Sequence, residues 1–176
     1  MRLGQGGFVR QTGMVLLISL VFLLLLSLVG LSSMQGAVTQ QKIAGSFWHG
    51  NQSLQRAESG LRFGEATVQR ESATWPVCRS IVSCAPPNEA LSVVRAGGSY
   101  LSGITWVAVK GGLYGVQSLG PGVGVARLPA LTPATLYRVT AVGLSGQART
   151  VLESVYARVE EEGGSRFRRV AWRQLQ

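Results

Sequence analysis

The first part of this chain changes abruptly from polar to apolar residues at Met14. Residues 14–31 are apolar apart from two serines and one glycine. Eighteen helical residues of about 1.5 Å rise each span about 27 Å, close to the thickness of a bilayer core. No charge stands between Arg10 and Lys42. Because basic residues precede the run, the positive-inside rule keeps the N-terminus in the cytoplasm and exports the rest. The pattern predicts one membrane-spanning helix.

The helical pattern continues beyond the apolar run. Apolar residues recur every seven positions at Phe47, Leu54, Leu61 and Val68, and Ala57 falls on the same face. Polar residues fill the remaining positions, and no proline occurs before residue 76. The spacing predicts one helix of about fifty to sixty residues, whose second half is amphipathic and packs on a globular domain.

After residue 70 the pattern predicts a connecting region and then an antiparallel sheet. TWPVCRSIVSCAPPN contains three prolines and both cysteines, which is typical of an irregular loop. Alternating or β-branched segments separated by glycine-containing turns then predict strands at 104–109, 113–117, 135–143, 148–159 and 167–175. Four or five antiparallel strands against one helix face form an α+β layer pair. The segment 119–133 is rich in glycine and proline, so we expect a long connection that is also a candidate contact surface.

The two cysteines, Cys78 and Cys84, have different expected states in the two compartments. An oxidising periplasm favours a disulfide that closes a short loop, whereas a cytosolic protein would keep two buried thiols. The predicted export of this region favours the disulfide.

Composition changes the picture mainly by exclusion. The chain of 176 residues carries a formal charge of +9 and has no aspartate. A Ser–His–Asp triad and an Asp-rich calcium loop are therefore impossible. His49 is the only histidine and is expected to be a packed or solvated helix residue. GPGVGVA lacks the flanking strand and helix of a phosphate-binding loop. We expect no enzyme activity, no cofactor and no metal site.

An arginine cluster occupies the C-terminal segment. Arg166, Arg168, Arg169 and Arg173 are interleaved with Phe167 and Trp172. Strand alternation predicts Arg166 and Arg168 on one face and Arg169 and Arg173 on the other. Such a cluster can attract nucleic acid or anionic lipid. The glutamate run at 160–162 offers a simpler set of partners, so nucleic acid is not expected as a partner.

Three classes of N-terminal segment fit the apolar run to different degrees. A cleavable signal peptide has an apolar core of about 7–15 residues, shorter than this one. A plain anchor gives no reason for the amphipathic continuation. The segments RQTGMVLLISLVFLLLLSLVGLSSM, LQRAESGLRFGEA, YRVTAVG and RTVLESVYARV resemble type IV pilins, and within them the minor pilins of the PilX kind. The resemblance implies that prepilin peptidase cuts after Gly13 and N-methylates Met14.

The resemblance also implies a fold and a division of the chain. The fold is the α+β type IV pilin fold, with a long N-terminal helix packed on an antiparallel sheet of four to five strands. The helix is transmembrane in its first half and amphipathic in its second. The expected parts are a cleaved leader at 1–13, the transmembrane half at 14–31, the amphipathic half at 32–70, a disulfide-containing connection at 71–103 and the sheet at 104–176.

One departure from the family bears on function. Ile18 would be the fifth mature residue, where most pilins have a glutamate that is thought to neutralise the N-terminal amine of the subunit added before. A subunit without that carboxylate suits the pilus tip, although the position could also be inessential. The resemblance thus implies a minor pilin that primes type IV pilus assembly at or near the tip and supports adhesion and twitching motility.

The implied partners are other minor pilins, the major pilin, a large tip adhesin, prepilin peptidase and the inner membrane. The implied location is the inner membrane before assembly and the pilus afterwards. The alternatives are a minor pseudopilin of type II secretion and an unprocessed single-pass inner-membrane protein with a periplasmic binding domain. Tip pseudopilins usually carry a large inserted helical domain, for which 176 residues leave no space.

Overall fold

A single long helix begins the computed structural model, which describes residues 12–71, 75–125 and 128–175. This helix, α1 (Thr12–Glu71), has 60 residues, as its unbroken sequence pattern predicted. The chain divides into two compact units, residues 1–45 and 46–176. Most of the expected leader, residues 1–11, lies outside the described residues.

The part of α1 in the first unit is almost entirely exposed. Its apolar side chains from Met14 to Leu31 are exposed, and among the described residues α1 is the one helix long and apolar enough to cross a membrane. A helix that is hydrophobic all round is stable in water only when it is buried, and a bilayer provides such burial. This half of α1 therefore fits a membrane anchor.

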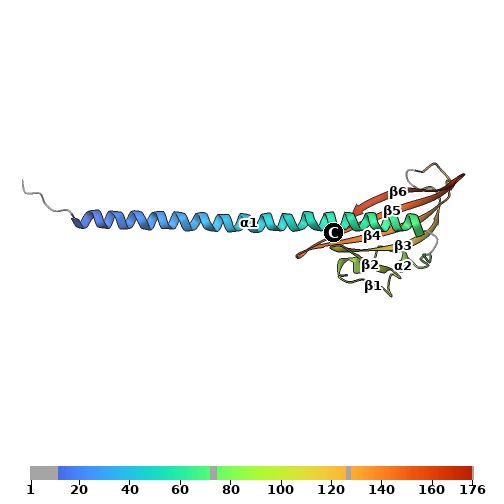
Figure 1. The fold of residues 1–176 in the computed structure, drawn as a ribbon, viewed down its shortest axis with the longest axis horizontal. Helices are drawn as coiled ribbons and strands as arrows, with labels where there is room; N and C mark the ends of the chain where they lie inside the picture. Colours follow the sequence, from blue (N-terminus) through green and yellow to red (C-terminus); the bar gives the residue numbers. More distant parts are fainter. Residues whose placement is uncertain (1–11, 72–74, 126–127, 176) are drawn as a thin grey trace, which may run out of the picture. The chain divides into compact units, whose positions relative to one another are not determined.

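A six-stranded antiparallel sheet forms the second unit together with the rest of α1 (Figure 1). Each strand pairs with the next along the chain, because short glycine-containing turns join most neighbours. The strands are β1 (Gly97–Gly98), β2 (Thr105–Val109), β3 (Gly112–Gly122), β4 (Ala134–Ser145), β5 (Ala148–Glu161) and β6 (Gly164–Gln174). The prediction of four to five strands misses β1, whose two glycines have no side-chain pattern to reveal it.

The prediction of a long connection at 119–133 is partly wrong, because β3 extends into it. β3 continues to Gly122 instead of ending at 117, and it pairs with β4 across an irregularity between Ser118 and Gly120. Gly120 has φ +85°, a conformation that glycine adopts without steric cost. Leu119 is an extra residue in β3 without a partner in β4, so the pairing continues from Gly120 to Gly122. The composition of this segment, rich in glycine and proline, had indicated a loop.

Close packing joins α1 to one face of the sheet. Ala57, Leu61 and Val68 are buried against Val139 and Ala141 of β4, as the seven-residue spacing predicted. Phe47 is 70% exposed, so the expectation that it shares this packing is wrong. Gly64 allows the helix to approach the sheet closely, because a Cβ at this position would lie 2.4 Å from Val139 Cγ1.

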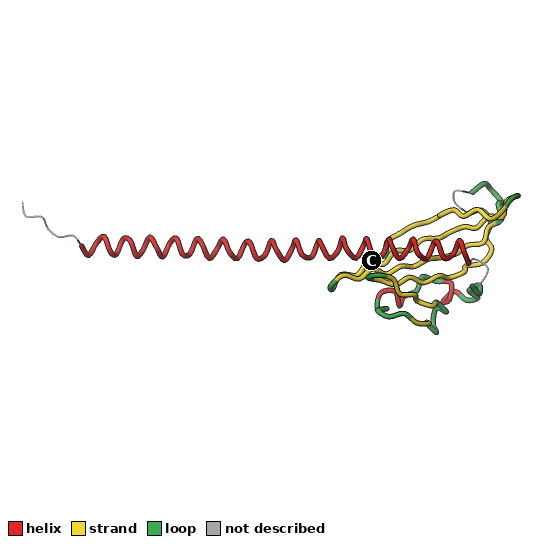
Figure 2. Tube along the Cα trace, in the orientation of Figure 1, coloured by secondary structure: helices red, strands yellow, loops and turns green. Residues whose placement is uncertain are grey.

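The opposite face of the sheet is covered as well, by the connecting region. Its helical turns are α2 (Ile81–Cys84) and η1 (Asn88–Leu91), and Figure 2 shows its loops beside β1 and β2. Ala90 of η1 packs with Ile104, Trp106, Val142 and Val151 in a second core cluster. The sheet is therefore buried on two faces, where the sequence predicted only one covering helix.

Candidate functional site

The N-terminal part of α1 presents the residues that sequence analysis singled out. Gly13, Met14 and Ile18 all lie within the helix, and the side chains of Met14 and Ile18 are exposed. Val15, Ile18, Ser19 and Phe22 line one apolar strip of the helix. The first turn of α1 contains no acidic residue, and the first glutamate of the chain is Glu58. This surface can make apolar contacts with lipid or with other apolar helices, but it offers no carboxylate to a neighbouring amine.

An ion pair between the buried Glu65 and the partly exposed Arg169 attaches the amphipathic half of α1 to β6. Glu65 is 5% exposed, and its Oε1 accepts a hydrogen bond from Arg169 Nε at 2.9 Å. Tyr156 of β5 donates its hydroxyl to Glu65 Oε2 at 3.2 Å. The hydrogen bond to Glu65 raises the pKa of Arg169, while burial, followed by the charge of Glu65, raises the pKa of Tyr156. The carboxylate thus connects the helix to two strands.

Glu65 is one of the polar residues that the pattern assigned to the positions outside the packing face of α1, but the structure buries it. The residue follows Ala57 and Leu61 at intervals of four, which is the spacing of one helix face. That spacing could have predicted burial, but the charge argued against it, because glutamate is rarely buried without a partner. The partner, Arg169, lies 104 residues away in the sequence.

A second buried carboxylate lies on the opposite face of the sheet. Glu153 of β5 is 3% exposed, with Arg138 Nε of β4 at 3.1 Å and Arg173 Nη2 of β6 at 3.0 Å. Burial lowers the pKa of Arg138, and the charge of Glu153 offsets part of this effect. The three side chains link three adjacent strands.

Arg138 and Gln117 also hold the disulfide loop. Cys78 and Cys84 are bonded, with a Cα–Cα distance of 5.3 Å, as expected for an exported domain. Arg138 donates to the carbonyl of Cys84, and Gln117 Nε2 donates to the carbonyl of Ser83 at 2.7 Å. The loop is therefore docked on the sheet through its own backbone carbonyls.

The arginines of β6 divide between the faces differently from the prediction. Arg169 pairs with Tyr156 on the helix face, whereas Arg173 pairs with Glu153 on the other face, where Arg166 and Arg168 also lie. An irregularity opposite Val155 and Tyr156 adds one residue to β6. A bulge of one residue reverses the side-chain alternation beyond it. Arg173 therefore lies on the face opposite to the one expected.

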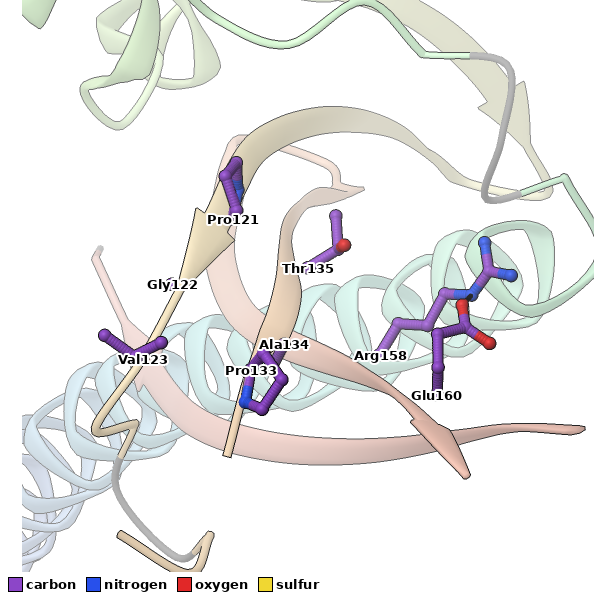
Figure 3. Close-up of a pocket in the computed structure, with 8 residues that line it drawn as sticks. All are labelled: Pro121, Gly122, Val123, Pro133, Ala134, Thr135, Arg158 and Glu160. Atoms are coloured by element: carbon purple, nitrogen blue, oxygen red, sulfur yellow. Dashed lines mark ion pairs between the residues drawn. The ribbon is translucent and has the colours of Figure 1, made fainter. Parts of the chain in front are cut away.

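A cleft of about 320 Å³ lies where β3, β4 and β5 meet, near the connection that was a candidate contact surface (Figure 3). Pro121, Val123 and Pro133 are among its apolar lining residues. Arg158 and Glu160 project from β5, with Nε and Oε1 at 2.7 Å. Among the described residues, the cleft is lined by apolar side chains, the hydroxyl of Thr135 and the Arg158–Glu160 ion pair.

His49 packs against the sheet at the end of β4. Its Nδ1 lies 3.1 Å from Ser145 Oγ, and the side chain is half-buried. In the part of the chain that the structure describes, no group of three or more His, Cys, Asp or Glu side chains is arranged to hold a metal ion.

Comparison with protein-family models gives a match on α1. No curated protein matches the chain, and no solved structure does. Residues 12–62 match the family model described as PilX N-terminal. The matched segment covers the exposed apolar half of α1 and most of the half packed on the sheet. The chain is therefore similar to the PilX family over 51 of its 176 residues, and its α+β fold is consistent with that similarity.

Proposed function

We propose that this chain is a minor pilin that primes type IV pilus assembly and sits at or near the pilus tip. Prepilin peptidase removes residues 1–13 and N-methylates Met14. Before assembly the protein spans the inner membrane once, with its sheet domain in the periplasm. Its partners are other minor pilins, the major pilin and a large tip adhesin, and through them it supports adhesion and twitching motility.

The observation that carries this proposal is the continuity of α1. One helix is fully exposed and uncharged over its apolar half and then packs through Ala57, Leu61 and Val68 on an antiparallel sheet. A plain anchor needs only the first of these halves. A subunit that leaves the membrane and enters a helical filament needs both, because the apolar half then packs among the same halves of its neighbours.

Replacement of Gly13 with leucine is expected to block processing. The side chain meets no steric obstacle, since a Cβ at Gly13 has nothing within 4 Å, so any effect arises at the peptidase. Mass spectrometry of the membrane fraction should find the full-length precursor in the variant. The parent protein should begin at N-methylated Met14.

The matched control is Gly30→Leu, in the same helix and with equally open surroundings. It should be processed like the parent protein. A mature chain of normal mass from the Gly13 variant would refute the cleavage site. An intact Met1 in the parent protein would instead support the unprocessed membrane protein.

Ile18 supports the tip location. A subunit without a carboxylate at this position cannot neutralise the amine of a subunit ahead of it, yet it can offer its own amine to the subunit behind. The absence costs nothing when no subunit lies ahead. The tip is the one place in a filament where that condition holds.

Ile18→Glu is therefore expected to lower or leave unchanged the number of pili per cell. A charged residue costs about 2.5–3.5 kcal/mol at the centre of a span and less near its edge, and without a partner amine nothing offsets that cost. Electron microscopy counts the pili, and quantitative immunoblotting of sheared filaments gives the ratio of this subunit to major pilin. A large increase in that ratio would contradict the tip location.

A further inference from the structure

The outer edge of β6 is long and open. β6 has 11 residues and pairs with β5 alone among the described strands, whereas β1 at the other edge of the sheet has two residues (Figure 1). No residue of β6 is buried in the described structure. A long exposed edge is a template for pairing with another strand.

The register identifies the backbone groups that the edge offers. Glu161 and Gly164 close the hairpin, and in an antiparallel ladder the N–H groups point alternately toward the partner strand and away from it. The N–H groups of Arg166 and Arg168 thus point to β5, and those of Ser165, Phe167 and Arg169 point outward. The irregularity after Arg169 interrupts this order. The regular part of the edge, 164–169, suits an added strand of about six residues.

The side chains of this edge restrict the chemistry of the added strand. Arg166 and Arg168 lie on one face of the edge and Phe167 on the other. The side chain of Arg166 is 66% exposed, and its contact with Glu161 spans 3.6 Å, so that pair contributes little. Residues 46–176 carry fourteen basic and eight acidic residues, a formal charge of +6. Opposite charges that face each other across strands stabilise pairing.

A second copy of this chain does not fit the edge. Two β6 strands in antiparallel pairing would bring arginines against arginines, and like charges directly opposite each other are destabilising. We propose that residues 164–169 form a strand-addition site for an extended, acidic segment of a different protein. The inference goes beyond the proposed function, since it concerns the sheet domain and does not depend on processing or on the tip.

The test measures binding of a peptide of about six residues that alternates glutamate and valine to the full chain in detergent micelles. Ser165→Pro removes one outward N–H and is compatible with an edge strand. Ser165→Ala removes the same hydroxyl but keeps the N–H. We expect the dissociation constant to increase about five- to tenfold for the proline variant relative to the alanine variant. A lysine–valine peptide should bind more weakly than the acidic one.

Amide hydrogen exchange of the parent protein provides a measurement without substitution. The peptide should slow exchange at Ser165, Phe167 and Arg169 and leave Arg166 and Arg168 unchanged, because their N–H groups already pair with β5. This measurement decides the question if the proline variant does not fold.

Three outcomes would overturn the proposal. In the first, the proline and alanine variants bind the peptide equally and exchange is unchanged, which indicates a merely electrostatic surface. In the second, a DNA duplex of similar charge binds as tightly as the peptide and is insensitive to Ser165→Pro, which indicates a nucleic-acid surface. The third is an absence of binding by the acidic peptide.

Discussion

Glu153→Gln is expected to lower the free energy of unfolding by about 3–5 kcal/mol. Glutamine keeps the shape of the side chain but removes its charge. The side chain of Arg138 is 12% exposed, so its charge would remain largely buried without a counter-charge. Arg173 is 55% exposed and can turn to water, so the loss arises mainly at Arg138. Urea unfolding of the full chain in detergent micelles, followed by tryptophan fluorescence, measures the change.

The matched control is Glu161→Gln on the same strand. Glu161 is 50% exposed, and its pair with Arg166 spans 3.6 Å, so its removal should change stability by about 0–1 kcal/mol. Equal unfolding midpoints for the two variants would show that the Glu153 network contributes no more than a surface ion pair.

Gly143→Ala is expected to destabilise the sheet domain by about 3 kcal/mol, the upper part of the range for overpacked cores. A Cβ at this position would lie 1.9 Å from the carbonyl oxygen of Ser53 and 2.5 Å from the backbone nitrogen of Ala57. Both atoms belong to the backbone of α1, so a rotamer change cannot relieve the clash and the helix must move away from β4. The same urea titration measures the loss.

Gly50→Ala is the control for the glycine substitution. A Cβ there meets nothing within 4 Å, and alanine is favoured over glycine in a helix by about 1 kcal/mol. This variant should be as stable as the parent protein or more stable. If Gly143→Ala matches it, α1 does not pack against β4 as closely as the structure indicates.

The elements of the fold follow from local patterns. The apolar run at 14–31 and the seven-residue spacing after it predicted α1, and the predicted end at residue 70 is one residue before the observed end at Glu71. Glycine-containing turns predicted four hairpin strands and the last strand, because a turn restricts backbone conformation within a few residues. The disulfide between Cys78 and Cys84 was also predicted from the sequence, because the expected membrane span would place both cysteines outside the cytoplasm. The candidate residues Gly13, Met14 and Ile18 depend on the sequence and its resemblance to pilins, and the structure adds that Met14 and Ile18 are exposed on α1.

Tertiary structure alone decided which charges are buried and which face of the sheet each side chain occupies. Glu65 lies on the buried face of α1 because Arg169, a hundred residues later, neutralises it there. Arg173 lies on the face opposite to the predicted one, because one extra residue in β6 reverses the alternation. Phe47 has the spacing of a core residue yet remains exposed. A periodic pattern records only the intervals between residues, whereas burial and ion pairing depend on partners that folding brings from distant parts of the chain.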